Sequence, residues 1–471
     1  MTPFALAVLA SLLYLALLFG IAFHADRHQA YAGNPLIYAF SLAGLLSAWA
    51  FYGSAGGLHI VPFALGCSLS CAVWGTLLRR MARLARDENL ASLADFLASR
   101  YGSSASVGCA ATFICAVGLL PCIAIQLRAI IHSLRLIASP QAQSGDPLLL
   151  HGLAIVLLLG LFCIRFGARH LDASEQHAGF VTALAASTAA TFAALGILAL
   201  FALFHLPHPS PPSLPLTLPS SPQWAALMAL GALTVFCLPG QFHVGIVENR
   251  NRRQIACAMW IFPALLLLFT IALLPVLLAG QALPGARQGD YLALLLPLSQ
   301  NAPHVTLVVF LGGLAASIGM ALSSILTLAT MILNHVLVPL VLRFKGSEQS
   351  LSGLLMRAKR GVILVLVVGS ALLDLLLTRA LDLTTIALLS FAALAQLAPA
   401  LLGGMFWKKA AKRGATVGAL TGLAVWGFTL LMPALDVSHH LPPGAGGVTG
   451  LVDWSHGLFW SLFVNVSIFV G

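Results

Sequence analysis

The sequence predicts an all-α integral membrane protein with about thirteen transmembrane helices. Thirteen apolar segments are long enough to cross a bilayer, which takes roughly 20 residues of helix. Of all residues, 59% are hydrophobic and 8% are charged, and the mean hydropathy is +0.96. The lysines and arginines lie mostly in short loops between the apolar segments. This composition excludes an ordinary soluble domain.

Each predicted helix is a continuous apolar run bounded by charged, Pro-rich or Gly-rich residues. The first run has no positive stretch before it and is followed by Arg27, so we expect a retained helix and not a cleaved signal peptide. The stretch 90–100 is amphipathic and predicts a short surface helix. The predicted transmembrane helices cover 3–23, 35–58, 62–84, 107–137, 148–167, 177–204, 222–247, 254–281, 303–341, 356–379, 382–403, 413–433 and 452–471.

The distribution of basic residues predicts the orientation. With the N-terminus outside, 20 of the 24 Lys and Arg residues fall in inner loops and 3 in outer loops. Because basic residues favour the cytoplasmic side, we expect an outer N-terminus and a cytoplasmic C-terminus in a bacterial inner membrane. No basic residue follows the last helix to anchor its inner end, so we expect further cytoplasmic sequence beyond Gly471.

Two segments in corresponding positions are interrupted. Residues 52–57 (YGSAGG) interrupt the second segment, and residues 238–241 (LPGQ) interrupt the seventh. A lipid-buried helix breaks only where its freed backbone groups meet protein, water or a ligand. Paired breaks of this kind indicate a transporter site near the membrane midplane.

Several motifs, in this order and spacing, resemble the sodium:solute symporter family, and most closely the N-terminal membrane domain of CbrA-type sensor histidine kinases. The motif at 238–249 is the most specific of them. The motifs lie at 34–41 (NPLIYAFS), 49–53 (WAFYG), 91–102 (ASLADFLASRYG), 120–129 (LPCIAIQLRA), 238–249 (LPGQFHVGIVEN) and 312–320 (GGLAASIGM).

The resemblance implies a LeuT-type inverted five-helix repeat. Residues 1–34 would form a peripheral first helix and inner loop, 35–247 the first repeat, 254–403 the second repeat, and 413–471 two peripheral helices that lead into a cytoplasmic region. It also implies a small polar organic solute as substrate, with an amino acid as the first choice and histidine as the first candidate.

Two departures from the family bear on ion coupling. Family symporters place adjacent hydroxyl residues on the ninth helix to bind sodium, whereas this chain has Gly319 and Met320 there. Sodium prefers oxygen ligands, which neither residue supplies from its side chain. Ser323 and Ser324 follow one turn later. The second helix also carries no acidic residue. We therefore expect no sodium coupling; a proton could drive transport, or the domain could sense without pumping.

Arg128 is the most conspicuous single residue because it lies inside the fourth predicted helix. A charged residue there is costly, which makes it a candidate for function. It could bind a substrate carboxylate through two parallel hydrogen bonds, or it could extend to the outer interface. Gln126 is a second candidate on this helix, on another face.

The remaining candidate residues lie around the two breaks and in the tenth helix. Gln241 could donate to and accept from a substrate, with Gly240 beside it. His243 could relay a proton or be a structural histidine. Asp374 could carry a proton, pair with a buried cation or pair with Arg379. Around the first break the substrate-binding candidates, which could equally serve packing, are Ser47, Trp49, Phe51, Tyr52 and Gly53.

Other classes of function lack a motif. There is no Walker A sequence, nucleophile elbow or HExxH motif, and we expect no catalytic residues, cofactor or metal site. The eight cysteines form no metal-binding spacing, and no basic run indicates nucleic acid. The expected partners are a small solute and membrane lipid. A cytoplasmic histidine kinase or response regulator is a further candidate, if the domain is a sensor; kinase activity would need a C-terminal region beyond this chain.

Overall fold

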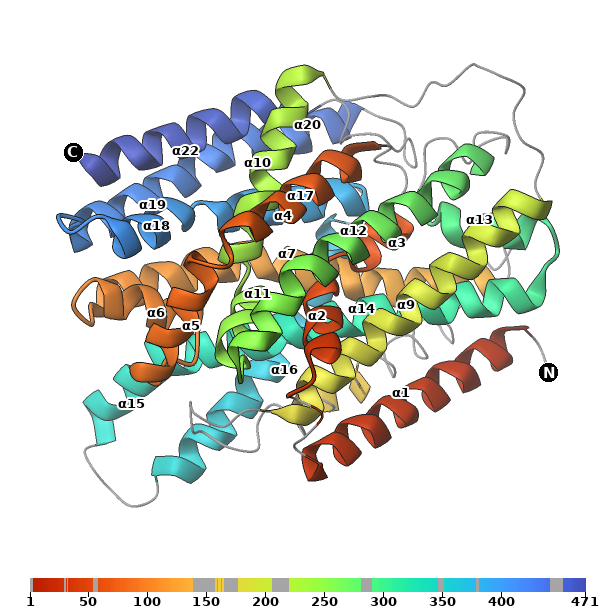
Figure 1. Cartoon of the computed structure of the whole chain (residues 1–471), viewed down its shortest axis with the longest axis horizontal. Coiled ribbons are helices and arrows are strands. Elements are labelled where there is room, and N and C mark those ends of the chain that lie inside the picture. The colour runs from red at the N-terminus through yellow and green to blue at the C-terminus, as the bar shows by residue number, and fades with distance from the viewer. Residues whose placement is uncertain are drawn as a thin grey trace.

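A computed structural model describes residues 3–28, 31, 33–53, 58–138, parts of 157–164, 177–205, 220–280, 290–345, 351–377, 381–440 and 452–471. This part of the chain is helical and contains no strand. Most of the long helices run along one common direction, and the two termini lie at opposite ends of the bundle (Figure 1).

The helices, in chain order, are α1 (Pro3–Arg27), α2 (Pro35–Ala43), α3 (Ala48–Tyr52), α4 (Ile60–Ser70), η3 (Cys71–Val73), α5 (Leu77–Asp87), α6 (Leu93–Arg100), α7 (Ala105–Ala138), α9 (Ala178–His205), α10 (Ser221–Cys237), α11 (Pro239–Phe242), η4 (His243–Val247), α12 (Arg252–Gly280), α13 (Leu292–Ser299), α14 (Pro303–Ile332), η6 (Leu333–Leu337), α15 (Val338–Lys345), α16 (Leu351–Leu377), α17 (Leu383–Ala395), α18 (Ala398–Phe406), α19 (Lys412–Trp426), η7 (Gly427–Leu431), α20 (Met432–His440) and α22 (Trp454–Val470).

In the described residues, seven helices are long and apolar enough to span a membrane, or nine if each of two bent pairs is one span. Their outer faces expose large apolar side chains, such as Leu13 on α1 and Val365 on α16, which are 61% and 70% exposed. Such surfaces suit contact with lipid, so the protein is a multi-pass membrane protein. The predicted span 148–167 lies largely outside the described residues, so the count of thirteen stays a prediction.

Three elements differ from or refine the predicted ones. The short helix predicted at 90–100 is confirmed as α6, which begins at the cap Ser92, whose side chain accepts from the Asp95 amide. It is not the exposed surface helix that was predicted, because Leu93, Phe96 and Leu97 are buried. The predicted span 62–84 is bent by 68° between η3 and α5, at the point where the arginine-rich helix begins. The structure also adds α13, preceded by Tyr291 in a left-handed conformation with φ 70°. This helix lies at the end of the bundle where α1 begins (Figure 1). Following the predicted orientation, we call this end the outer side and the opposite end the inner side.

The break in the seventh segment is confirmed, and the second segment has an additional break that was not predicted. At Leu238 the chain is extended, and α10 and the following segment meet at 53°. Helix α3 ends at Tyr52, where the predicted break begins, and residues 54–57 of that break lie outside the described residues. The segment is also interrupted at residues 44–47, between α2 and α3. Leu45 and Leu46 are apolar, so hydropathy gave no sign of this second interruption. At Gly53, which ends α3, an added Cβ would lie 2.1 Å from the Trp49 carbonyl oxygen.

Helix α14 lies at the centre of the bundle, where it packs against α9 and α7. Two adjacent glycines of α14 allow this close packing. A Cβ at Gly312 would lie 2.2 Å from the Cβ of Ala194 on α9, and one at Gly313 would lie 2.0 Å from the ring of Tyr52 on α3. These contacts hold α3 and α9 directly against α14, beside the two helix breaks.

Candidate functional site

A small polar cavity lies where the two broken segments meet α9 and α14. Both breaks contribute backbone and side chains to its wall, which is the arrangement expected of a site at paired breaks. Its volume is about 20 Å³, which is room for about one water molecule. The lining residues are Ser41, Gly44, Leu46, Leu184, Ser187, Thr188, Thr191, Leu238, Gln241, Val244, Ala315, Ala316, Gly319, Met320 and Ser323.

Gln241 joins the two broken segments across this cavity. Its side-chain Nε2 donates to the carbonyl oxygen of Leu42, at the end of α2, over 3.0 Å. Its Oε1 is buried and has no hydrogen-bond partner among the described residues. A buried amide oxygen without a partner loses its hydration without replacement, which costs free energy. It is therefore an acceptor available to a donor in the cavity.

The hydroxyl groups in the wall are also poised as acceptors. Thr188 and Thr191 donate to the carbonyls of Leu184 and Ser187 one turn earlier on α9, and Ser41 donates to Tyr38. With the hydroxyl hydrogens committed to backbone, the lone pairs of these oxygens remain free to accept. No ionisable side chain is among the lining residues. The wall suits a ligand rich in N–H or O–H donors.

The residues of α14 that line the cavity differ in whether their side chains carry an oxygen atom. Gly319 and Met320 line the cavity without a side-chain oxygen. Ser323 lines it too, one turn further on. Its Oγ lies so close to Gly240 that a Cβ added there would be 2.1 Å away. Glycine at 240 therefore lets the second break approach the Ser323 hydroxyl.

The candidates of the first break pack around the cavity and do not line it. The Trp49 ring packs edge-on against Phe63 and Phe391, 5.3 and 5.5 Å between ring centroids, and its Nε1 donates to the Leu45 carbonyl. Phe51 lies beside Gly312. Ser47 precedes the first residue of α3 but makes no capping hydrogen bond, and its Oγ is buried with no hydrogen-bond partner in the described part of the chain. Their role in substrate binding stays a prediction.

Tyr52 and Gly53 contact the segment before α13 and the start of α17. The Tyr52 carbonyl accepts from the backbone amide of Tyr291 over 2.7 Å, and the two rings lie 5.1 Å apart. The Gly53 carbonyl accepts from the hydroxyl of Thr384, on α17, over 2.5 Å. The segment before α13 and the start of α17 are thus attached to the outer end of the broken segment.

Arg128 is buried in an ion pair on this outer side, away from the cavity wall. Its Nε lies 2.6 Å from Oδ1 of Asp374 on α16, and its Nη1 donates to the Leu381 carbonyl over 2.9 Å. The guanidinium side chain is 4% exposed, so it does not extend to the interface. Arg379, the partner considered for Asp374, lies outside the described residues. Gln126 donates to the Cys122 carbonyl on α7, and its Oε1 is buried without a hydrogen-bond partner among the described residues.

His243 belongs to a cluster at the inner end of the second broken segment. Its Nε2 lies 3.4 Å from Oε1 of the buried Glu248, and Nδ1 of His177 lies 3.5 Å from the same oxygen. The His177 backbone amide also donates to the Glu248 carboxylate. Glu248 therefore ties the start of α9 to the end of η4. Asp374 and His243 lie in separate clusters, so the structure does not join them into one proton path.

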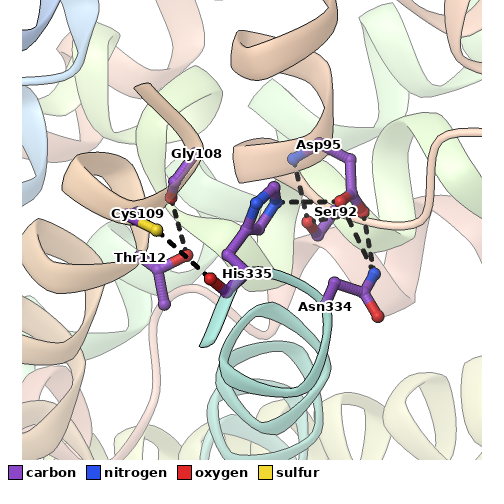
Figure 2. A network of polar contacts seen from close by, with 7 residues as sticks. All are labelled: Ser92, Asp95, Gly108, Cys109, Thr112, Asn334 and His335. Carbon is purple, nitrogen blue, oxygen red and sulfur yellow. Dashed lines mark hydrogen bonds and ion pairs between the residues drawn. The ribbon is translucent and has the colours of Figure 1, made fainter. Parts of the chain in front are cut away.

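A second inner cluster attaches α6 to η6, which directly follows α14 (Figure 2). His335 Nε2 lies 2.9 Å from Asp95 Oδ1, and the Asn334 amide donates to Asp95 over 3.2 Å. His335 fits against α7 because residue 108 is glycine, where a Cβ would lie 2.3 Å from the imidazole. Burial alone would raise the pKa of Asp95, but contacts with His335, Ser92 and Asn334 outweigh it and lower that pKa.

Sequence reasoning missed the hydroxyl residues of the cavity wall. Ser187, Thr188 and Thr191 recur at helical spacing within one apolar span, and this spacing was the available signal. Ser41 was seen only as part of a motif. The hydroxyls could not be assigned to a site because their position depends on which helices pack around the breaks.

No protein-family model and no curated protein matches the chain. Among solved structures, it is similar to the substrate-bound outward-open state of a Na⁺-coupled sialic acid symporter, with a TM-score of 0.66 over 98% of this chain and 97% of that chain, at 13% sequence identity. A manganese transporter of Eremococcus coleocola aligns with a TM-score of 0.47 over 93% of this chain and 95% of that chain, at 14% identity. At such identities the first likeness shows the fold alone. The chain is thus an all-helical, multi-pass membrane protein with the fold of a transporter.

Proposed function

We propose that this protein binds a small polar organic solute between its two broken segments and carries it across the bacterial inner membrane. The supporting observation is the cavity in which both helix breaks, Gln241 and the hydroxyls of α9 converge. An amino acid fits this wall because its ammonium group supplies donors to uncharged acceptor oxygens. Histidine remains the first candidate substrate by resemblance, within a LeuT-type arrangement of the sodium:solute symporter family.

The conformation described here is closed around the cavity. A space for about one water cannot hold an amino acid, so α3 or the second broken segment must move to admit one. On the outer side the Tyr52–Tyr291 contact must open. On the inner side the bonds from Gln241 to Leu42 and from the Tyr38 hydroxyl to the Gly245 carbonyl must open. Alternate opening of these two sets would give alternating access.

For the driving ion, we propose a proton in place of sodium. Gly319 and Met320 supply no side-chain oxygen to the cavity. Sodium coupling is the alternative to be tested, because Ser323 lines the cavity one helical turn after Met320 and carries a hydroxyl. His243, next to the buried Glu248 and 20% exposed, is the proposed proton carrier on the inner side, with Asp374 as the outer candidate.

The experiment is uptake of radiolabelled histidine into proteoliposomes under an imposed proton gradient, an imposed sodium gradient, or neither. We expect uptake with the proton gradient alone. Sodium-driven uptake would refute the assignment of the coupling ion and point to Ser323. Binding of histidine without uptake under any gradient would refute transport and favour a sensory domain with a kinase partner. No binding would exclude histidine as the ligand.

A matched pair of variants tests the site itself. Gln241→Leu removes the free acceptor and the bond to Leu42, and Gln300→Leu makes the same change at an exposed position on the outer side. One lost hydrogen bond weakens binding by about 2- to 10-fold. We expect that loss of histidine affinity for Gln241→Leu and no change for Gln300→Leu. Equal affinities in the two variants would place the solute elsewhere.

A further inference from the structure

A second cavity, distinct from the solute site, lies at the inner end of the bundle between α5 and the start of α12. Its volume is about 370 Å³, large enough for a small molecule or a lipid headgroup. Five of the ten residues that line it are arginines. The polar residues used below are Arg79, Arg80, Arg83, Arg86, Asn249 and Arg252.

The arginines converge because of the way α5 folds. Leu77, Leu78 and Met81 are buried, and α5 packs against η4 through this apolar side. Arg79, Arg83 and Arg86 follow one another at helical spacing of four and three residues, so they form one stripe on α5. Arg252 begins α12 and faces the stripe across the cavity. The helix N-terminus adds a partial positive charge there.

Within the described residues, no carboxylate lines this cavity or pairs with its arginines. Arg86 Nη1 donates to the backbone and side-chain oxygens of Asn249 over 3.2 and 3.3 Å. The Nε of Arg79 is buried without a hydrogen-bond partner in the same part of the chain. Like charges at this spacing repel one another, so the arrangement gains stability from an anion that neutralises them.

Basic inner loops are common in membrane proteins because they set the orientation. That role depends on the number of charges near the ends of the spans and does not require them to face one cavity. Lys408 and Lys409, for example, are exposed on the loop after α18. The convergence of side chains from α5 and α12 therefore needs a separate explanation.

We propose that this cavity is a binding site for a phosphate group, held between the arginine stripe of α5 and the N-terminus of α12. The planar guanidinium forks of Arg79, Arg83 and Arg252 match phosphate oxygens with paired hydrogen bonds. The Asn249 side chain orients Arg86 at the edge of the site. The phosphate belongs either to an anionic lipid headgroup or to a soluble phosphorylated molecule.

Occupation of this site would act on the second broken segment. Helix α5 packs against η4, and Asn249 directly follows Glu248, which holds His243. An anion that holds α5 against α12 would therefore stabilise the inner half of the broken segment in the position described here. This consequence depends on the contacts alone, whatever solute the protein carries.

The test is binding by the full chain in phosphatidylcholine nanodiscs, with and without phosphatidylglycerol, and with inorganic pyrophosphate as the soluble probe. Isothermal titration measures pyrophosphate affinity, and native mass spectrometry counts the phosphatidylglycerol molecules retained. We expect saturable binding of at least one probe. Retained lipid would identify a headgroup as the source, and pyrophosphate binding without retained lipid would identify a soluble phosphate.

Two variants and a control distinguish specific binding in the cavity from nonspecific attraction of anions to positive charge. Arg79→Gln with Arg83→Gln should weaken binding about tenfold or more, since each loses charge-assisted bonds. Arg252→Gln, at an exposed position, should weaken it without any effect on folding. Lys408→Gln with Lys409→Gln removes the same charge from the same side and should leave binding unchanged. Absence of saturable binding of both probes, or equal losses in the control, would overturn the proposal.

Discussion

Replacement of Asp374 by asparagine tests the buried ion pair that joins α7 to α16. Arg128 is 4% exposed and the Asp374 side chain 12% exposed, with 2.6 Å between the paired atoms. Removal of one partner from a buried pair costs roughly 3–5 kcal/mol, because the other charge stays buried without compensation. Arg128 keeps its bond to the Leu381 carbonyl, so we expect a loss at the lower end, about 3 kcal/mol.

The free energy of unfolding can be measured by titration with sodium dodecyl sulfate from a mild detergent, followed by tryptophan fluorescence. A double-mutant cycle isolates the pair: Asp374→Asn and Arg128→Met should each be destabilised, and the double variant should lose much less than their sum. Removal of both charges leaves neither without a partner, which is why the double change is milder. Asp87→Asn, at an exposed position at the end of α5, is the matched control.

The result that would refute this reasoning is a cost below about 1 kcal/mol for Asp374→Asn, the range of a solvated surface pair. Additive losses in the double variant would also refute it, because independent residues add. Either outcome would mean that Arg128 is neutralised by other groups, and that its role in substrate binding should be tested next.

Two further predictions concern helix packing and pH. Gly313→Ala should destabilise the protein by about 1–3 kcal/mol, because its Cβ would overlap the ring of Tyr52. The control Gly369→Ala should leave stability unchanged, because a Cβ there has no neighbouring atom within 4 Å. Equal melting temperatures of the two variants would contradict the packing described. The lowered pKa of Asp95 means that its contact with His335 contributes stability above the unfolded-state pKa of about 3.9, and that this stability is lost as the pH falls through the lower folded-state pKa. Asp95→Asn should therefore be less stable than the parent protein at neutral pH and should lose less stability on acidification. Thermal denaturation across pH 2–7 measures both effects. Parallel curves of melting temperature against pH for the two proteins would contradict this prediction.

The sequence by itself determined the class of protein and the short helix α6. Apolar length and low charge are properties of local composition, and a bilayer imposes one minimum length on every spanning helix. The break at Leu238 was also visible, because Pro239 and Gly240 act on the local backbone. These features need no knowledge of which helices are neighbours.

The tertiary structure decided the first break, the partner of Arg128 and the wall of the cavity. The break at residues 44–47 lies among apolar residues, and Gly44 there packs against Thr188 on α9, so only the neighbouring helix explains it. Asp374 meets Arg128 across 246 positions in the chain. The hydroxyl residues of α9 look like ordinary residues of an apolar span in the sequence. They line the polar cavity only because α9 and α14 pack around the two breaks. Periodicity shows which residues share a helix face, but only the packing of helices decides what that face meets.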